Sequence, residues 1–221
     1  MRSKRVLVAT AFGFACLVGL VGATAEQLLT ASEEVGAPQV VFAAAGAGQG
    51  AGQGAGRTDA EAIADAMSAA PTAISEDATI LEWPSEPDGD FRVLREGTNG
   101  WSCIASTTFA REPFLPNPSC DDAVWLEFEH AYIEGRDPLI EGIGIAYMLS
   151  GDAGTSNTDP FATGPTDDNE WHVSGPHLMI LVPDPAMLEG VSTDPHNGGP
   201  YVMFAGTPYA HIMVPAGDDQ R

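Results

Sequence analysis

The spacing of hydrophobic residues predicts a helix at the start of residues 58–216. Ile63, Ala66 and Met67 share one helical face, and Thr58 or Asp59 can cap the helix. Pro71 lies just beyond these positions, and proline is poorly tolerated in a helix interior. The helix is therefore expected to end before residue 71.

A second, clearer helix is predicted after Ser119 or Asp121, either of which can cap it, and Gly135 is expected to stop it. Its apolar stripe consists of Val124, Trp125, Phe128, Ala131 and Tyr132. The side facing water is expected to carry Asp122, Glu127, Glu129 and His130. The pattern is typical of an amphipathic helix packed on a core.

Alternating patterns predict strands at residues 79–83, 91–95, 142–150, 177–182, 201–205 and 209–214. In residues 142–150 one face carries Gly144, Ala146 and Met148, which favours close packing of a helix or backbone there. A short helix is expected at residues 185–189, and residues 105–119 and 151–174 are expected to be irregular. Strands outnumber helices and are joined largely by turns. We therefore expect an α+β fold with a mainly antiparallel sheet and two or three helices.

The amino terminus has the pattern of a signal peptide. Arg2, Lys4 and Arg5 precede an uncharged apolar run over residues 6–22, and Ala23-Thr24-Ala25 fits the small-x-small cleavage pattern. An uncleaved anchor helix is the alternative, because the run approaches the length that spans a bilayer. The Gly/Ala/Gln repeat at residues 46–56 is typical of a flexible linker. We expect a signal peptide (1–25), a spacer (26–57), one globular domain (58–216) and a tail (217–221), exported to the periplasm or secreted.

Composition narrows the range of partners. The 221 residues carry 31 acids against 9 bases, a formal charge of −22, and no lysine follows Lys4. Such a surface repels phosphate backbones and anionic lipid, so neither nucleic-acid binding nor membrane binding beyond the signal peptide is expected. A hydrophobic content of 44% suffices for a packed core. The acidity has two explanations, a saline habitat or a GC-rich genome, and the low arginine count favours the first.

The cysteines indicate a disulfide. Once residues 1–25 are removed, only Cys103 and Cys120 remain, in an oxidising compartment. A redox-active pair is the alternative, but it usually requires C-x-x-C spacing, and these two residues are 17 apart in sequence.

A repeated H-x-M motif is a candidate copper site. His177 and Met179 open one predicted strand, and His211 and Met213 open another. Period-two geometry places each histidine on the same face as its methionine. Imidazole and thioether ligands together suit copper, above all Cu⁺. The alternative is that the methionines fill the core and the histidines are satisfied at strand ends.

The irregular loop that follows residue 150 offers two further candidates. Its carboxylates, with Asp159, Asp167 and Asp168 foremost, are the hard ligands that Ca²⁺ prefers, although no EF-hand pattern is present and such residues are also common in turns. Trp171 could form a stacking platform for a small polar ligand. Its polar partners would be Glu170, Asn157 and Asp159.

An enzyme is the alternative reading of the same loop. His172, His177 and Asp168 are candidate catalytic residues, with Ser174 a candidate nucleophile between the histidines. No G-x-S-x-G, H-E-x-x-H or P-loop pattern occurs. Ligand or metal binding by residues 151–177 therefore ranks slightly above a hydrolase-like reaction. The ligand, the cofactor (Ca or Cu are the candidates) and the oligomeric state stay open.

Three segments resemble those of a family of uncharacterised exported bacterial proteins. They are EGTNGWSC (96–103), SNTDPFATGPTDDNEWHVSGPHLMI (156–180) and PYVMFAGTPYAHIMVP (200–215). The resemblance covers roughly residues 59–215. It implies export and a single domain, and it implies no reaction, cofactor or catalytic residue.

Overall fold

The computed structural model describes residues 57–84, 89–107 and 116–218. The predicted signal peptide and nearly all of the predicted spacer lie outside these residues. The helices are α1 (Asp59–Met67), α2 (Thr72–Ser75), α3 (Ala123–Glu134) and the 3₁₀ helix η1 (Pro185–Leu188). The strands are β1 (Thr79–Glu82), β2 (Arg92–Arg95), β3 (Ser102–Ile104), β4 (Ser119–Asp121), β5 (Gly144–Met148), β6 (Thr155–Ser156), β7 (Trp171–His172), β8 (His177–Leu181), β9 (Tyr201–Met203) and β10 (His211–Pro215).

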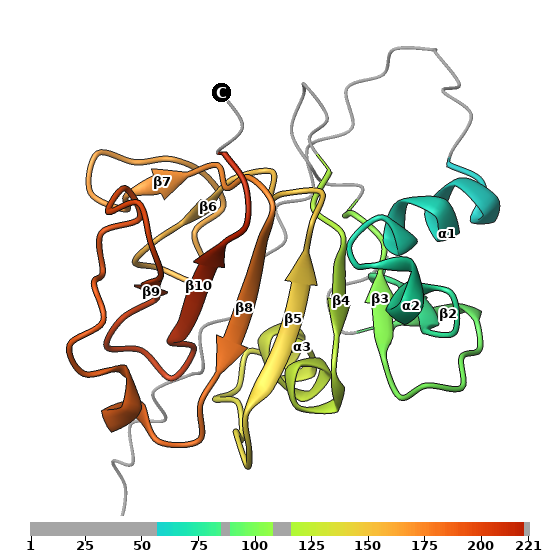
Figure 1. Cartoon of the computed structure of the whole chain (residues 1–221), viewed down its shortest axis with the longest axis horizontal. Coiled ribbons are helices and arrows are strands. Elements are labelled where there is room, and N and C mark those ends of the chain that lie inside the picture. Colours follow the sequence, from blue (N-terminus) through green and yellow to red (C-terminus); the bar gives the residue numbers. More distant parts are fainter. Residues whose placement is uncertain (1–56, 85–88, 108–115, 219–221) are drawn as a thin grey trace, which may run out of the picture. The chain divides into compact units, whose positions relative to one another are not determined.

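Eight of the strands form one sheet in the order β2-β1-β3-β4-β5-β8-β10-β9, and β6 pairs with β7 in a separate small sheet (Figure 1). In the large sheet β1 and β3 run parallel, whereas the other neighbouring pairs are antiparallel. The α+β prediction with a mainly antiparallel sheet is therefore confirmed.

The predictions of the cap residue and of the water-facing side of α3 are partly wrong. The cap is Asp122, whose Oδ1 accepts the backbone N–H groups of Val124 and Trp125, because Ser119 and Asp121 belong to β4 and are buried. Gly135 ends the helix with a φ of 64°, as predicted. The water-facing prediction is wrong for Glu129, whose Oε1 accepts the indole N–H of Trp125 at 3.2 Å. A buried indole N–H needs an acceptor, and the residue four positions later supplies one. His130, also expected on the water-facing side, is half-buried and its ring meets the ring of Phe91 at 5.3 Å.

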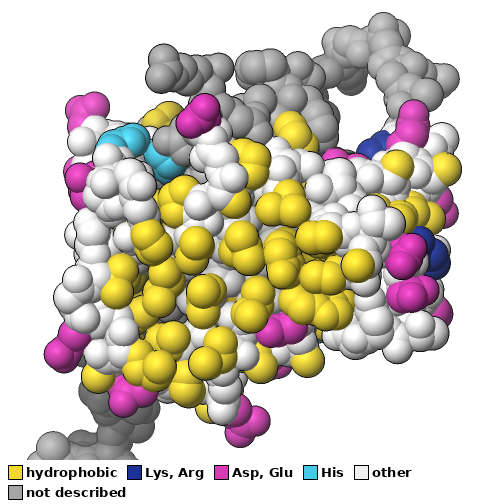
Figure 2. All heavy atoms as spheres, in the orientation of Figure 1, with side chains coloured by type: hydrophobic (Ala, Val, Ile, Leu, Met, Phe, Trp, Pro, Cys, Tyr) yellow, Lys and Arg dark blue, Asp and Glu magenta, His cyan; other side chains and the backbone are white. Residues whose placement is uncertain are grey.

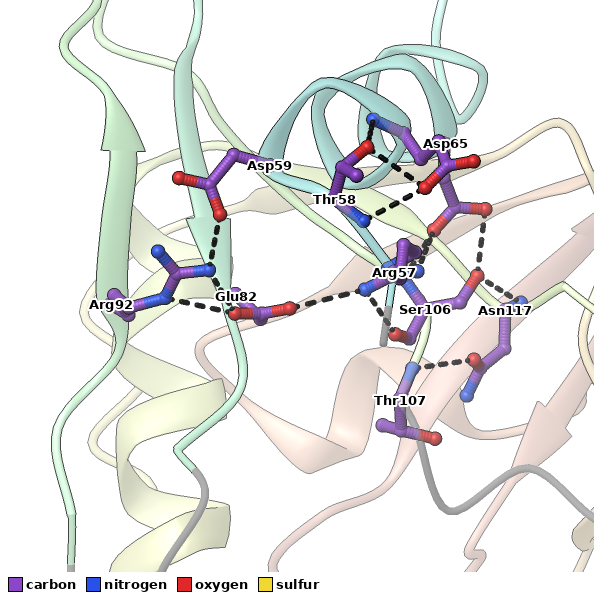
Figure 3. A network of polar contacts seen from close by, with 10 residues as sticks. Arg57, Thr58, Asp59, Asp65, Glu82, Arg92, Ser106, Thr107 and Asn117 are labelled. Carbon is purple, nitrogen blue, oxygen red and sulfur yellow. Dashed lines mark hydrogen bonds and ion pairs between the residues drawn. The ribbon is translucent and has the colours of Figure 1, made fainter. Parts of the chain in front are cut away.

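A polar network fastens α1 to the strands beside it (Figure 3). Thr58 and Glu61 form a capping box at the start of the helix. Asp65 on α1 accepts the backbone N–H and the hydroxyl of Ser106 at 2.7 and 3.0 Å, and it pairs with Arg57 at 3.0 Å. Arg57 also reaches Glu82 of β1 at 3.5 Å. The network is held by half-buried side chains, so these charges are less screened than exposed ones.

Two hydrophobic clusters flank the sheet. The first joins α1 to β1, β3 and β4 and contains alanines together with Ile80 and the disulfide Cys103–Cys120, which confirms the predicted bridge. The two cysteines lie opposite each other on β3 and β4. The second cluster joins α3 to β5, β8, β9 and β10 and is centred on Trp125 and Phe128. A Cβ built on Gly144 of β5 would lie 3.0 Å from Val124 of α3, so the predicted close packing over the small residues is confirmed.

Within the described residues, every helix is too short or too polar to cross a bilayer.

Candidate functional site

The strand pairing gathers three separated segments at the start of β8. Met148, the last residue of β5, lies opposite His177, the first residue of β8, so the loop after β5 returns beside the loop before β8. The backbone N–H of Asp152 donates to the carbonyl of Ser174 at 3.0 Å and ties these loops together. Tyr201 begins β9 and lies close to the same place. A small hollow of about 10 Å³ lies between the loop before β8, the start of β9 and the end of β10.

His172, Ser174, His177 and Tyr201 provide the polar side chains around this hollow, and Pro176 and Pro195 provide part of its apolar wall. Its volume accommodates roughly one water molecule. A site of this size suits an ion, a water molecule or a single polar group of a larger ligand. It is too small for a whole sugar.

The ring of His177 has a fixed tautomer. Its Nδ1 lies 2.7 Å from the carbonyl oxygen of Gly175, and since a carbonyl can only accept, Nδ1 carries the proton. Nε2 is then the lone-pair nitrogen of the neutral ring. Metal-binding and proton-accepting histidines are commonly oriented in this way.

Asp152 supplies the carboxylate of the site. Its Oδ1 accepts the backbone N–H of Gly154 at 3.3 Å. Burial raises the pKa of Asp152, whereas the positive charge available on His177, and to a smaller extent on His172, lowers it. The carboxylate is thus electrostatically coupled to both imidazoles. Asp168, the acid predicted for this role, is exposed and accepts the hydroxyl of Thr166 at 2.9 Å.

His172 lies in β7, where it pairs with Thr155 of β6, and only 6% of it is exposed. Its ring centroid is 5.0 Å from that of His196 and 6.3 Å from that of Tyr201. His196 is exposed in the turn begun by Asp194. The hollow is therefore bordered by two buried imidazoles and a third on an exposed turn.

Ser174 contributes a buried hydroxyl. The residue is 4% exposed, and its Oγ has no hydrogen-bond partner in the described part of the chain. A buried polar atom of this kind calls for an explanation such as a bound water, ion or ligand. Because Ser174 lines the hollow, a group bound there could supply the partner.

Asn157 organises the neighbouring loop. Its side-chain amide donates to Glu170 Oε2 at 2.9 Å and to the carbonyl of Thr193 at 3.0 Å. Its backbone also bonds Glu170 and Phe204, the two described non-glycine residues with positive φ. These bonds hold the strained backbone of both residues. Asn157 and Glu170 of the predicted ligand set thus contact each other and have a structural role.

The other members of that set lie apart from this contact. Trp171 is half-buried and packs over Gly154, where an added Cβ would lie 2.6 Å from the indole nitrogen. Asp159 is exposed and accepts the backbone N–H of Phe161 at 2.9 Å. Trp171 is therefore committed to packing on at least one side.

The loop acids proposed for Ca²⁺ are dispersed. Asp159, Asp167 and Asp168 are all exposed, and the loop is held by Asn169, whose amide donates to the carbonyl of Gly164 at 2.7 Å, and by Ser156. Across residues 57–84, 89–107 and 116–218, no three His, Cys, Asp or Glu side chains already stand close enough to hold one ion. The loop thus has hydrogen bonds of its own that order it.

The H-x-M motifs occupy neighbouring antiparallel strands. Met179 lies directly opposite Met213, but His177 lies opposite Pro215, which places the two histidines at opposite ends of the pair, about 13 Å apart along the strand direction. His211 Nδ1 donates to the carbonyl of Tyr209 at 3.0 Å, and burial lowers its pKa to about 4. Its ring is surrounded by those of Trp125, Phe128 and Phe204. The pairing brings the two thioethers together and keeps the imidazoles apart.

Sequence reasoning did not connect Asp152 with His177. The two are 25 positions apart, and only the pairing of β5 with β8 brings them together. It also missed a pair of interacting acids, the buried Asp121 of β4 and the half-buried Glu129 of α3. Burial, followed by the charge of Glu129, raises the pKa of Asp121 well above its usual range, and burial raises the pKa of Glu129 to about 7. The spacing of Trp125 and Glu129, four residues apart on a helix, was the available signal.

Comparison of the chain with family models, curated proteins and solved structures found no match.

Proposed function

We propose that the protein binds a divalent transition-metal cation at the hollow lined by His172, Ser174 and His177, with the carboxylate of Asp152 as a further ligand. The observation that carries this proposal is a space of about 10 Å³ lined by two imidazoles and by the buried hydroxyl of Ser174, which has no hydrogen-bond partner among the described residues. The carboxylate of Asp152 interacts electrostatically with both imidazoles. Imidazole nitrogen with carboxylate oxygen is a ligand set that suits Zn²⁺ and Cu²⁺. A formal net charge of −22 favours a cation over an anion.

Binding requires a small closure of the site. His172, His177 and Asp152 do not yet stand at the spacing of a metal centre. His196 is the side chain best able to complete the ligand set, because it is exposed, lies in a turn that includes Gly198, and already contacts the ring of His172. An ion would draw these side chains together and order the turn.

Thermal unfolding of the disulfide-intact protein tests the proposal. At a hundredfold excess over its dissociation constant, a ligand adds about 2.7 kcal/mol, which raises the Tm of a domain of this size by about 5–11 °C. We expect Zn²⁺ or Cu²⁺ to produce such a shift at neutral pH and Ca²⁺ to produce none. A shift with Ca²⁺ alone would instead implicate the acidic loop, and a shift with Cu⁺ alone would implicate the paired methionines.

Matched variants assign the effect to residues. Asp152→Asn and His177→Gln should each remove most of the shift. His130→Gln, in α3 and in contact with Phe91, should leave it intact. If all three variants bind Zn²⁺ as the wild type does, the ion is not held at this hollow.

A hydrolase-like reaction at the same hollow is the second candidate, favoured by the buried hydroxyl of Ser174 beside two histidines. A fluorophosphonate probe tests it, because an activated serine forms a bond from Oγ to phosphorus and releases fluoride, while a histidine accepts the hydroxyl proton. Labelling that is lost in Ser174→Ala and in His172→Gln would support an enzyme. An unlabelled wild type leaves no support for a serine nucleophile.

We also infer that the protein is exported with residues 1–25 removed. The Cys103–Cys120 disulfide supports this inference, because such bridges persist in oxidising compartments. Amino-terminal sequencing of the protein recovered from its producing cells should begin at Glu26. A chain recovered with Met1 or Arg2 intact would instead indicate an uncleaved anchor.

A further inference from the structure

The sheet has a broad apolar face on the side opposite α3. Trp125 and Phe128 of α3 pack against Ala146, Met179 and Met213, so the alternate side chains of β5, β8 and β10 point away from the helix. The strand register aligns them in two rows, which consist of Ile145, Ile180 and Ile212, and of Tyr147, Leu178 and Val214. All six are half-buried, with part of each side chain exposed. Figure 2 shows the resulting hydrophobic area in the middle of this view.

No described helix covers this area. Figure 1 shows α1 and α2 over the end of the sheet formed by β1 to β4, in front of the strands, whereas α3 lies behind the sheet. Tyr147, which contacts the cluster under α1, marks the border between the covered and the open parts of the face. A contiguous apolar area of this kind is a common mark of an interaction site.

The charged side chains that border this face are acidic. Glu141 and Asp184 are exposed near the end where β5 begins and β8 ends, and Asp218 is exposed beyond β10 at the opposite end. The described arginines are engaged elsewhere: Arg57 and Arg92 with acids beside α1 and β1, Arg136 with Glu127 and Glu134, and Arg95 with backbone carbonyls near α2. Figure 2 likewise shows Lys and Arg only at the end of the molecule that carries α1, and most of the Asp and Glu around the hydrophobic area.

We propose that this face, centred on Ile180, binds an amphipathic helix of a partner protein whose polar side is basic. Three strands at a spacing of about 4.8 Å span roughly 10 Å, which matches the diameter of one helix. A helix with an apolar stripe between basic residues would cover both rows and meet the acids at their ends. A second copy of this chain fits poorly, because both copies would carry a formal charge of −22. The proposal is independent of the metal site.

A designed helical peptide provides the probe. It has leucine at positions i, i+3, i+4 and i+7 over 18 residues, lysine at its polar positions and a fluorophore at one end. A charge-reversed peptide carries glutamate in place of lysine. Fluorescence anisotropy should show that the lysine peptide binds the full chain at least tenfold more tightly than the glutamate peptide. The affinity should fall as NaCl is raised.

Two double variants locate the binding. Ile180→Ser with Ile212→Ser should weaken the lysine peptide at least tenfold, with circular dichroism confirming that the fold is retained. Glu141→Gln with Asp184→Asn, which leaves the apolar rows intact, should weaken it several-fold. Leu139→Ser with Met187→Ser removes two side chains that are 65% and 54% exposed outside the rows, and should change nothing. His177→Gln should also leave peptide binding unchanged.

Several results would overturn the proposal. Equal affinity for the two peptides would rule out a preference for a basic partner. An unchanged affinity in the Ile180/Ile212 variant would show that the peptide does not bind this face. A concentration-dependent dimer in sedimentation velocity that is lost in the same variant would assign the face to a second copy. The absence of measurable binding to the lysine peptide at low salt would reject the proposal outright.

Discussion

At the residue scale, the least expected feature is an acid on α3. Glu129 is half-buried and accepts the indole N–H of Trp125, and burial raises its pKa to about 7 against a usual value of 4.5. A carboxyl whose pKa is higher in the folded than in the unfolded state stabilises the fold below the unfolded pKa, and that contribution is lost as the pH rises through the folded pKa. For Glu129 the window runs from about pH 4.5 to about pH 7.

We therefore expect Glu129→Gln, which stays neutral at every pH, to gain stability relative to the wild type as the pH rises. Each pKa unit corresponds to about 1.36 kcal/mol, and each kcal/mol moves the Tm by about 2–4 °C. The difference in Tm between variant and wild type should grow by several degrees between pH 5 and pH 8. Calorimetric scans of both proteins at the two values measure it, and a constant difference would contradict the assignment.

The pH dependence of stability must be measured as a difference between variant and wild type, because His211 changes the stability of the protein with pH in the opposite direction. Burial lowers its pKa to about 4, so its contribution is present above the unfolded value of 6.5 and is lost as the pH falls through about 4. The two effects overlap between pH 4.5 and pH 6.5 and partly cancel in the wild type. Subtracting the wild-type profile removes the contribution of His211 and leaves that of Glu129 together with Asp121, because the charge of Glu129 also raises the pKa of Asp121.

Asn157 provides a second prediction at this scale. Its side-chain amide donates hydrogen bonds to Glu170 and Thr193, and its backbone is hydrogen-bonded to two residues with positive φ. Asn157→Ala leaves the carbonyl of Thr193 without this donor and should cost about 1–3 kcal/mol. Asn197→Ala is the matched control, because Asn197 makes similar bonds to Asp194 and Pro200 but is exposed. Urea unfolding of both variants should show a clear loss only for the first, and equal losses would contradict a special role for Asn157.

At the scale of elements, the contact between α3 and β5 depends on a missing side chain. A Cβ on Gly144 would lie 3.0 Å from Val124 Cγ1 and 3.2 Å from Leu181 Cδ1, both tighter than ordinary contacts. Gly144→Val therefore forces the helix away from the sheet and should cost about 1–3 kcal/mol. Gly142→Val is the control, because nothing lies within 4 Å of a Cβ at that position. Thermal unfolding should separate the two variants by several degrees, and equal values would mean that the helix adjusts freely.

Local pattern predicted most elements, because their causes are local. Gly135 ends α3, and the alternation in residues 142–150 identifies β5 and its helix-facing side. Which of the two faces of a strand is buried depends on the elements that the tertiary structure packs against it. The larger residues Ile145 and Tyr147 lie on the half-exposed face, whereas Gly144 and Ala146 are buried, the reverse of what size alone suggests.

The candidate site was predicted less completely for the same reason. His172, Ser174 and His177 are close in sequence and do line one hollow. The carboxylate beside them comes from Asp152, which the order of strands places there, and the nearer acid Asp168 stays in solvent. Residue chemistry is readable from sequence, but which distant residues meet depends on the strand order.

At the scale of the whole molecule, the dominant feature is charge. The formal net charge is −22, and lysine is absent after Lys4. The exposed ion pairs of Arg92 and Arg136 involve few of the acids, and they stabilise the fold little because water screens them. Repulsion among the remaining carboxylates therefore outweighs these attractions, and screening it should favour the folded state.

We therefore expect the Tm to rise by several degrees between 0.05 and 1 M NaCl, because the screening length falls to about 3 Å at 1 M. The triple variant Asp90→Asn, Asp137→Asn and Asp167→Asn removes three exposed charges. It should melt at a higher temperature than the wild type in low salt and respond less to NaCl. This smaller response separates charge screening from a general effect of salt on hydrophobic burial, which would act equally on both proteins. A wild-type Tm that stays constant or falls with NaCl would remove the saline habitat as the explanation of the acidic composition and leave codon usage in its place.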